Sequence, residues 1–133
     1  ILPIQESGQL MFVDTPATNG SKLGATPFAD NITIRFVNGH TDSMMLPQIQ
    51  YKGQTIVYMA DLLPSVGHLP LPYVMAYDMF PLTTLNEKKS FLQEALDNNY
   101  LLYFEHDAQH ECCSLQLTEK GIRMNEAFRL KDL

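Results

Sequence analysis

The chain has 133 residues, with 15 acidic and nine basic side chains and a net charge of −6. The basic residues are scattered, which excludes binding to nucleic acid through its phosphates, because that binding needs clustered cations. No apolar run reaches the roughly eighteen residues needed to span a bilayer, so we expect no membrane partner and a cytoplasmic protein. The length predicts one domain with a sizeable buried core.

Four strands are predicted in the first sixty residues. A short strand is expected at residues 10–13, and residues 14–30, rich in Gly, Pro and Asn, predict a loop. A strong strand follows at Ile32–Val37. Residues 46–51 and 54–60 predict two strands joined by Lys52 and Gly53, a two-residue connection with Gly where a hairpin needs a positive φ.

Prolines dominate the next stretch, and a helix follows it. Residues 62–83 carry Pro64, Pro70, Pro72 and Pro81, which predicts an irregular, mobile lid or loop. The sequence of residues 84–87, Thr-Leu-Asn-Glu, matches a capping box and predicts a helix start there, with Asn98 and Asn99 ending the helix. Its apolar face is expected to contain Leu85, Phe91, Leu92, Ala95 and Leu96, and its polar face Lys88, Lys89, Gln93 and Glu94.

The last part of the chain predicts three more strands. Residues 100–105 form a nearly continuous apolar run, as in a central strand that is covered on both faces. Alternating patterns then predict strands over residues 113–118 and 122–130, with a turn near Gly121. Strands with a helix between them indicate an α/β fold, that is, a sheet with a helical layer.

Two adjacent cysteines, Cys112 and Cys113, are expected to be reduced. Neighbouring Cα atoms lie about 3.8 Å apart, whereas disulfides prefer about 4.4 to 6.8 Å. In a strand the two side chains would point to opposite faces, so they cannot bind one metal together. We interpret both as packing residues of a cytoplasmic protein.

Three potential metal ligands each follow a predicted strand: His40, Asp61 and His106. A neutral imidazole is a good zinc ligand, and a carboxylate can bridge two cations. Side chains at the ends of strands are expected to converge on one rim of the sheet. The alternative is that each histidine simply forms hydrogen bonds within a loop.

Residues 106–110 also match a second metal-binding motif. His106 and His110 are spaced as in the His-Glu-x-x-His helix of zinc proteases. A strand runs directly into this segment and alternation resumes by Cys113, so no room is left for a stable helix. We therefore expect His110 to be a surface or supporting residue.

Taken together, the Gly39-His40-Thr41 turn, Asp61 after an apolar strand and the Glu105-His106-Asp107 segment resemble the second half of the metallo-β-lactamase-fold hydrolases. Asp61 follows His40 by 21 residues, and His106 follows Asp61 by 45. The likeness covers roughly residues 32–124 and implies the C-terminal αβ half of a four-layer αββα sandwich. Residues 1–133 would then be one partial domain. The N-terminal half, with its His-x-His-x-Asp-His cluster, is expected to be absent.

The resemblance also implies a function and a set of ligands. The residue matching His40 binds one metal in that family, the residue matching His106 binds the other, and the residue matching Asp61 bridges both. The implied protein is a hydrolase, with two zinc ions, that cleaves an ester, lactone, amide or phosphoester bond. No residue of this chain is assigned a certain catalytic role, and the chain alone is expected to be inactive and to hold zinc weakly or not at all. A non-catalytic binding or structural domain remains the alternative.

Partners are predicted from the same reasoning. His68, Tyr73, Tyr77 and Asp78 follow Asp61 in the proline-rich segment, where they would contact a small-molecule substrate; alternatively, the tyrosines pack against the edge of the sheet. The charged fraction is low, at 18%. An apolar face left by a missing half-domain predicts a homo-oligomer.

Overall fold

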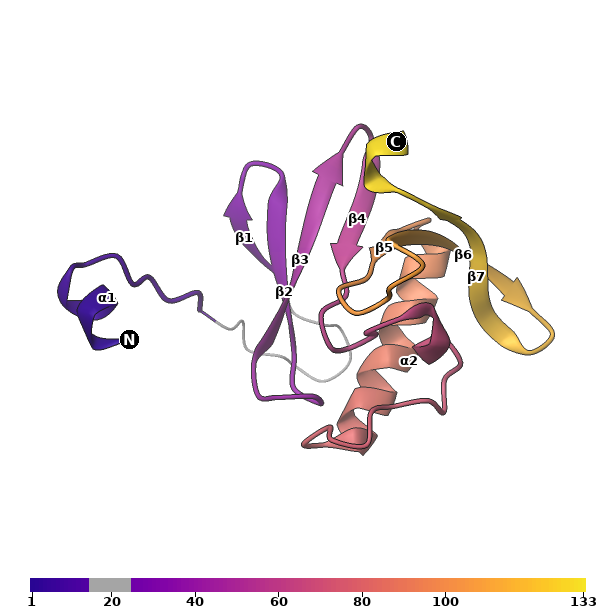
Figure 1. Cartoon of the computed structure of the whole chain (residues 1–133), viewed down its shortest axis with the longest axis horizontal. Helices are drawn as coiled ribbons and strands as arrows, with labels where there is room; N and C mark the ends of the chain where they lie inside the picture. The colour runs from indigo at the N-terminus through magenta and orange to yellow at the C-terminus, as the bar shows by residue number, and fades with distance from the viewer. Residues whose placement is uncertain (15–24) are drawn as a thin grey trace.

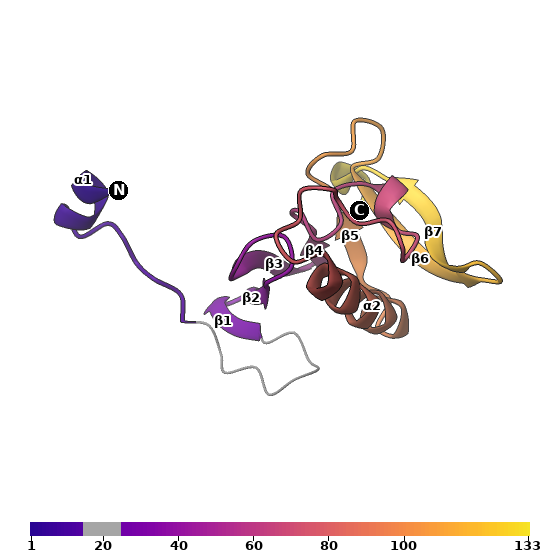
Figure 2. The ribbon, with the colours of Figure 1, turned by 90° about the horizontal axis from the view of Figure 1, so that it is seen from below.

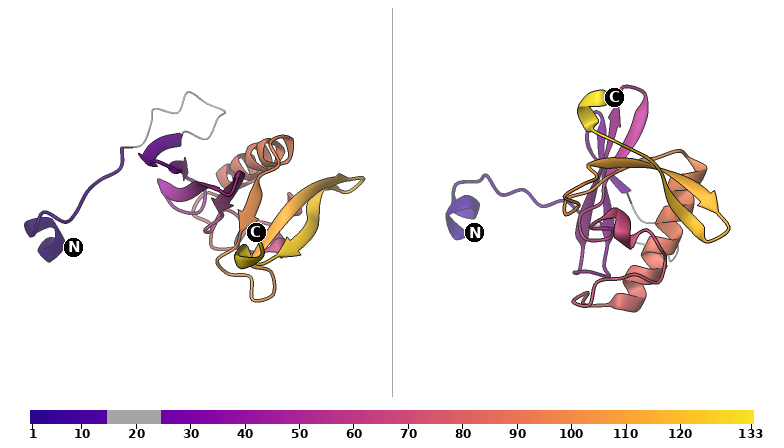
Figure 3. Two further views of the ribbon diagram at one scale, coloured as in Figure 1. Left: turned by 90° about the horizontal axis from the view of Figure 1, so that it is seen from above. Right: turned by 45° about the vertical axis from the view of Figure 1, so that its right-hand side comes forward.

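The computed structural model describes residues 1–14 and 25–133. Near the N-terminus, α1 (Leu2–Glu6) is a short helix without buried residues, and Figures 1, 2 and 3 show it apart from the rest of the fold. The strand predicted at residues 10–13 is wrong, because those residues have no regular structure. Their side chains lack a neighbouring strand against which to pack.

A single seven-stranded sheet forms the body of the protein, so the α/β prediction is confirmed. Its strands lie in chain order across the sheet: β1 (Ala25–Ala29), β2 (Ile32–Val37), β3 (Met44–Tyr51), β4 (Gln54–Tyr58), β5 (Leu101–Tyr103), β6 (Cys112–Thr118) and β7 (Gly121–Phe128). The loop predicted for residues 14–30 is wrong at its end, which forms β1. Residues 15–24 of that loop lie outside the described residues.

The hairpin between β3 and β4 is confirmed, with Lys52 and Gly53 at φ angles of 49° and 78°. Strand β4 ends at Tyr58, two residues before the predicted end. Strand β5 lies between β4 and β6 in the interior of the sheet, as the apolar run predicted. Strand β7 ends at Phe128 rather than at residue 130, and Leu130 begins a short 3₁₀ helix, η2 (Leu130–Asp132).

Strand direction places three loops at one edge of the sheet. Strands β2 and β3 are antiparallel, β3 and β4 are antiparallel, and β4 and β5 are parallel. Strands β2, β4 and β5 therefore run in the same direction, and their C-terminal ends lie at the same edge. The residues that follow these three strands include His40, Asp61 and His106.

Helix α2 (Pro81–Asp97) makes the crossover from β4 to β5 and covers one face of the sheet (Figure 3). The predicted capping box is wrong, because the helix begins at Pro81 and Thr84 already lies inside it. The predicted end is confirmed, with Asn98 as the C-cap. Placing Lys88 on the polar face was also wrong. Its side chain is fully buried, together with Phe91, Leu92 and Ala95, because it hydrogen-bonds to a neighbouring loop.

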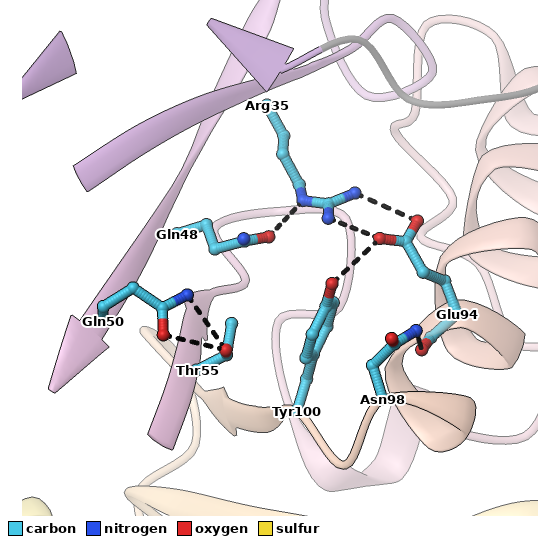
Figure 4. Close-up of polar contacts among 7 residues, drawn as sticks. All are labelled: Arg35, Gln48, Gln50, Thr55, Glu94, Asn98 and Tyr100. Atoms are coloured by element: carbon cyan, nitrogen blue, oxygen red, sulfur yellow. Dashed lines mark hydrogen bonds and ion pairs between the residues drawn. The ribbon is translucent and has the colours of Figure 1, made fainter. Parts of the chain in front are cut away.

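Arg35 of β2 ties α2 to the sheet (Figure 4). Its Nη1 donates to Glu94 Oε2 at 3.1 Å, its Nη2 donates to Glu94 Oε1, and its Nε donates to Gln48 Oε1 at 2.6 Å. Tyr100 Oη donates to the same carboxylate at 3.2 Å. A bidentate arginine–carboxylate pair is directional, so this contact fixes the position of the helix on the sheet as well as its distance.

The segment between β4 and α2 is irregular, as the prolines predicted. Its only regular element among the described residues is a 3₁₀ turn, η1 (Val66–His68). Several of its side chains are nevertheless buried, including Leu62, Leu63 and Leu69. The segment is therefore packed against the core rather than free of it.

Both cysteines are free and completely buried. Burial raises the pKa of the Cys112 thiol to about 11 and that of the Cys113 thiol to about 12. Their interpretation as packing residues is confirmed. In the described part of the chain, no helix has the length and apolar character needed to cross a membrane.

Candidate metal-binding edge

His40 lies in a tight turn after β2 that is bound to the start of α2. Glu87 of the helix accepts hydrogen bonds from the backbone N–H groups of Asn38, at 2.7 Å, and Gly39, at 3.0 Å. The backbone of Gly39 is pressed against Thr84, where a Cβ atom on residue 39 would lie 2.2 to 2.5 Å from Thr84 atoms. Only Gly fits at this position, because any side chain would overlap Thr84. The contact holds the His40 backbone in one place.

Asp61 follows β4 and lies between two histidines. Its Oδ2 is 3.5 Å from Nε2 of His40, and its Oδ1 is 3.3 Å from Nε2 of His106. The convergence expected from the strand ends is therefore observed. Each imidazole faces a different oxygen of the carboxylate. The Asp61 carboxylate therefore lies between the two imidazoles, with one oxygen toward each.

His106 follows β5, and its loop is fixed by hydrogen bonds. Its backbone N–H donates to the carbonyl of Pro64, and Asp107 Oδ2 accepts from the N–H of Val66 at 3.0 Å. Asp107 Oδ1 accepts from the N–H groups of Gln109 and His110. Partial burial raises the pKa of Asp107, but these backbone donors outweigh it and lower the pKa overall. No helix forms here, as expected, so the His-Glu-x-x-His reading is excluded.

A buried carboxylate, Asp78, faces the other ring nitrogen of His40. Its Oδ1 is 2.9 Å from His40 Nδ1, its side chain is completely buried, and its Oδ2 has no hydrogen-bond partner in the described part of the chain. An ionised carboxylate only accepts, so Nδ1 of His40 carries the proton. In the neutral imidazole, Nε2 is then the unprotonated nitrogen and faces Asp61. Sequence reasoning placed Asp78 only among possible substrate contacts and missed this role.

The donor set fits a metal ion between each imidazole and Asp61. In a neutral His40 imidazole protonated on Nδ1, the lone pairs on its Nε2 and on Oδ2 of Asp61 would face each other at 3.5 Å, a separation that a cation between them would fit. Two ligands of a tetrahedral zinc ion, each about 2.1 Å from it, are about 3.4 Å apart, close to both nitrogen–oxygen separations. Within residues 1–14 and 25–133, no three His, Cys, Asp or Glu side chains gather around one point to hold a single ion. Asp61 is shared by two nitrogen–oxygen pairs, one with His40 and one with His106.

Comparison with known proteins identifies the architecture. No family profile and no curated protein sequence matches the chain. Solved structures do match it: a probable metal-dependent hydrolase from Staphylococcus aureus aligns with a TM-score of 0.69 and 21% identity, covering 82% of this chain and 39% of that one. The chain has the fold of the C-terminal half of a β-lactamase-superfamily hydrolase.

Two further solved structures share this fold. One is AidC, a dizinc quorum-quenching lactonase in complex with a homoserine product, with a TM-score of 0.69 and 21% identity over 92% of this chain and 40% of that chain. The other is the hydrolase AbOPH of the β-lactamase superfamily, with a TM-score of 0.73 and 15% identity over 96% of this chain and 41% of that chain. The chain therefore spans about two-fifths of the structures it matches. At these identities the likeness establishes the fold.

A groove of about 380 Å³ adjoins the candidate metal-binding edge. His106, His68 and Tyr77 line it, and the ring of Tyr77 also contacts that of His40 edge to face, with centroids 6.0 Å apart. His68 Nδ1 is held 2.9 Å from Ser65 Oγ, and burial lowers the pKa of this imidazole. Tyr73, also predicted to face substrate, is 61% exposed and does not line this groove.

Buried Lys88 supports the loop that carries Tyr77 and Asp78. Its Nζ donates to the backbone carbonyls of Pro70 at 2.8 Å, Leu71 at 3.2 Å and Tyr73 at 2.7 Å. Burial lowers the pKa of Lys88 to about 8, against the opposing effect of the nearby Asp78 carboxylate. One ammonium group of α2 thus bonds to three carbonyls of a segment that, as described, forms neither strand nor α-helix.

Proposed function

We propose that this chain supplies half of the metal site of a hydrolase, in which His40 and His106 each bind one of two divalent ions and Asp61 bridges them. The observation that carries the proposal is the position of Asp61, whose two oxygens each face Nε2 of a different histidine, His40 and His106. Asp78 accepts from Nδ1 of His40 and so leaves Nε2 of a neutral imidazole free to bind a metal ion.

Each residue has a separate task in this proposal. Asp78 fixes the tautomer and the ring orientation of His40, as carboxylates behind metal-binding histidines generally do. Asp61 holds both positions at a set separation through its two oxygens. When bound, a pair of zinc ions lowers the pKa of a water molecule and polarises the bond under attack. His68 and Tyr77, in the adjoining groove, are placed to contact the substrate.

The proposed substrate is a small molecule with an ester, lactone, amide or phosphoester bond. The lactonase and the other hydrolases that share the fold support this range of chemistry. The groove beside the metal-binding edge supports a small ligand, because its volume lies at the lower end of typical ligand sites, about 300 to 1,000 Å³. The other half of the site would come from the part of the superfamily fold that this chain does not span.

The four histidines allow a direct test of the metal ligands. Zinc is added to the 133-residue chain while the imidazole signals of His40, His68, His106 and His110 are followed by NMR. We expect His40 and His106 to shift at millimolar zinc, with His68 and His110 as internal controls. An Asp61→Asn variant should lose much of this response. Equal shifts of all four imidazoles, or shifts of His68 and His110 without His40 and His106, would contradict the proposal.

Activity is tested on the full-length protein. Asp61→Ala removes the bridge, so we expect the variant to lose at least one metal ion and its hydrolytic rate. Metal content is measured by elemental analysis and hydrolysis with a panel of activated esters, lactones and phosphoesters. A variant that keeps both its metals and its rate would overturn the assignment of Asp61.

A further inference from the structure

A second groove lies on the helical side of the molecule, between α2 and the β6–β7 hairpin, which are neighbours in Figure 1. Its volume is about 280 Å³. Leu69 and Leu92 are almost completely buried, whereas Leu117 at the rim is 69% exposed. Leu71, Pro72 and Ile122 complete the apolar lining. The groove shares no lining residue with the metal-binding edge.

The charged side chains that line this groove, among the described residues, are all positive. Lys89, Lys120 and Arg123 line it, and none of the lining residues is acidic. These are three of only nine basic residues in a chain of net charge −6. An acidic protein that places a third of its cations around one apolar groove presents a local field that attracts anions.

The three cations have no carboxylate partner in the part of the chain that the structure describes. Arg123 uses Nη1 to donate to the carbonyl of Ile122 at 2.7 Å, which holds its guanidinium beside the hairpin turn. Its positive charge also reaches buried Lys88, where it contributes to the lowered pKa. An anion in the groove would offset this repulsion between like charges.

We propose that this groove binds a small amphipathic monocarboxylate, with its hydrocarbon part along Leu71, Leu117 and Ile122 and its carboxylate among the three cations. The combination of an apolar floor and a cationic rim matches the two ends of such a molecule. The volume lies just below the range of drug-sized sites, so the ligand has about ten non-hydrogen atoms. Octanoate meets this description.

The test uses the isotopically labelled 133-residue chain and octanoate, with octanol as an uncharged probe of the same length. We expect octanoate to shift backbone signals of residues 69–72, 89–93 and 117–123 with a Kd of about 1 mM, and octanol to bind at least about fivefold more weakly. Octanoate that binds no more tightly than octanol would overturn the proposal, as would shifts located elsewhere.

Charge-removing variants test the rim. Each of Lys89→Gln and Lys120→Gln should weaken octanoate binding about twofold to fivefold, the range for exposed charge pairs, and the double variant about tenfold. These two lysines are exposed, so the variants should fold normally. Lys131→Gln, an exposed lysine outside the groove, is the matched control and should leave the Kd unchanged. Unchanged binding in the double variant would overturn the role of the cations.

Discussion

Nδ1 of His40 lies 2.9 Å from Oδ1 of Asp78, although 38 residues separate them in the chain. The contact is set by backbone pairing. The N–H of Met79 donates to the carbonyl of His40, and the N–H of Phe80 donates to that of Gly39. The residue just before this pairing, Asp78, is therefore placed beside the ring of His40. The proton position on His40 depends on this carboxylate.

Asp78→Asn should weaken zinc binding at His40 by about 10- to 100-fold, the usual effect of removing a carboxylate behind a metal-binding histidine. The amide no longer specifies which ring nitrogen is protonated. Zinc titration followed by the His40 imidazole signal measures the effect, and ¹⁵N shifts of the ring report the tautomer. Asp97→Asn, at an exposed position of α2, is the control and should behave like the wild type. Wild-type affinity in Asp78→Asn would remove Asp78 from the site.

Gly39→Ala should destabilise the protein by about 1 to 3 kcal/mol, because the new methyl group would overlap Thr84, including its backbone. The overlap should also push the His40 turn away from α2. Urea unfolding measures the free energy of unfolding. Gly67→Ala is the matched control, because its Cβ would meet only Ser65 Oγ at 3.4 Å. Equal stability of the two variants would contradict the close packing of Gly39.

Because of Lys88, the free energy of unfolding should change with pH in the alkaline range. Burial lowers its pKa to about 8 in the folded protein, whereas the unfolded value is 10.5. Between these values the unfolded chain binds more protons, so this residue adds stability as pH rises and the contribution is lost as pH falls toward 8. From pH 7.5 to 10.5, the unfolding free energy of the wild type should rise relative to Lys88→Met by up to about 3 kcal/mol. Parallel pH profiles of the two proteins would contradict this.

Arg35→Met should lower the unfolding free energy by about 2 to 4 kcal/mol, because it leaves the Glu94 carboxylate without its bidentate partner in a partly buried position. Chemical denaturation checks the value. Arg129→Met removes an exposed arginine and should change stability by less than about 0.5 kcal/mol. If Arg35→Met were equally mild, the arginine would not be what holds α2 on the sheet.

Sequence patterns predicted most of the strands, because apolar periodicity and turn chemistry act over a few residues. Ile32–Val37, the hairpin at Lys52 and Gly53, and the central strand at residues 100–105 all depend on such local signals. The convergence of His40, Asp61 and His106 followed from strand direction.

The errors came from contacts between distant residues. Thr84 and Glu87 match a capping box, but Glu87 bonds to the His40 turn instead of its own helix start. Lys88 looks like a surface residue until the carbonyls of Pro70, Leu71 and Tyr73 are placed beside it. Strand β1 was missed for the same reason, since a five-residue edge strand is defined by its pairing with β2.

Because Glu87 of α2 is bonded to the His40 turn, the residues of the candidate metal-binding edge fall into two pairs that are held by different elements. His40 and Asp78 are carried by α2 and the segment paired with it, whereas Asp61 and His106 are carried by β4 and β5, joined through the Met59 N–H and the Tyr103 carbonyl. A small rotation of the helix on the sheet would move the first pair as a unit and alter the separation of His40 from Asp61. The separation of His40 from Asp61 thus depends on how the helix is seated on the sheet.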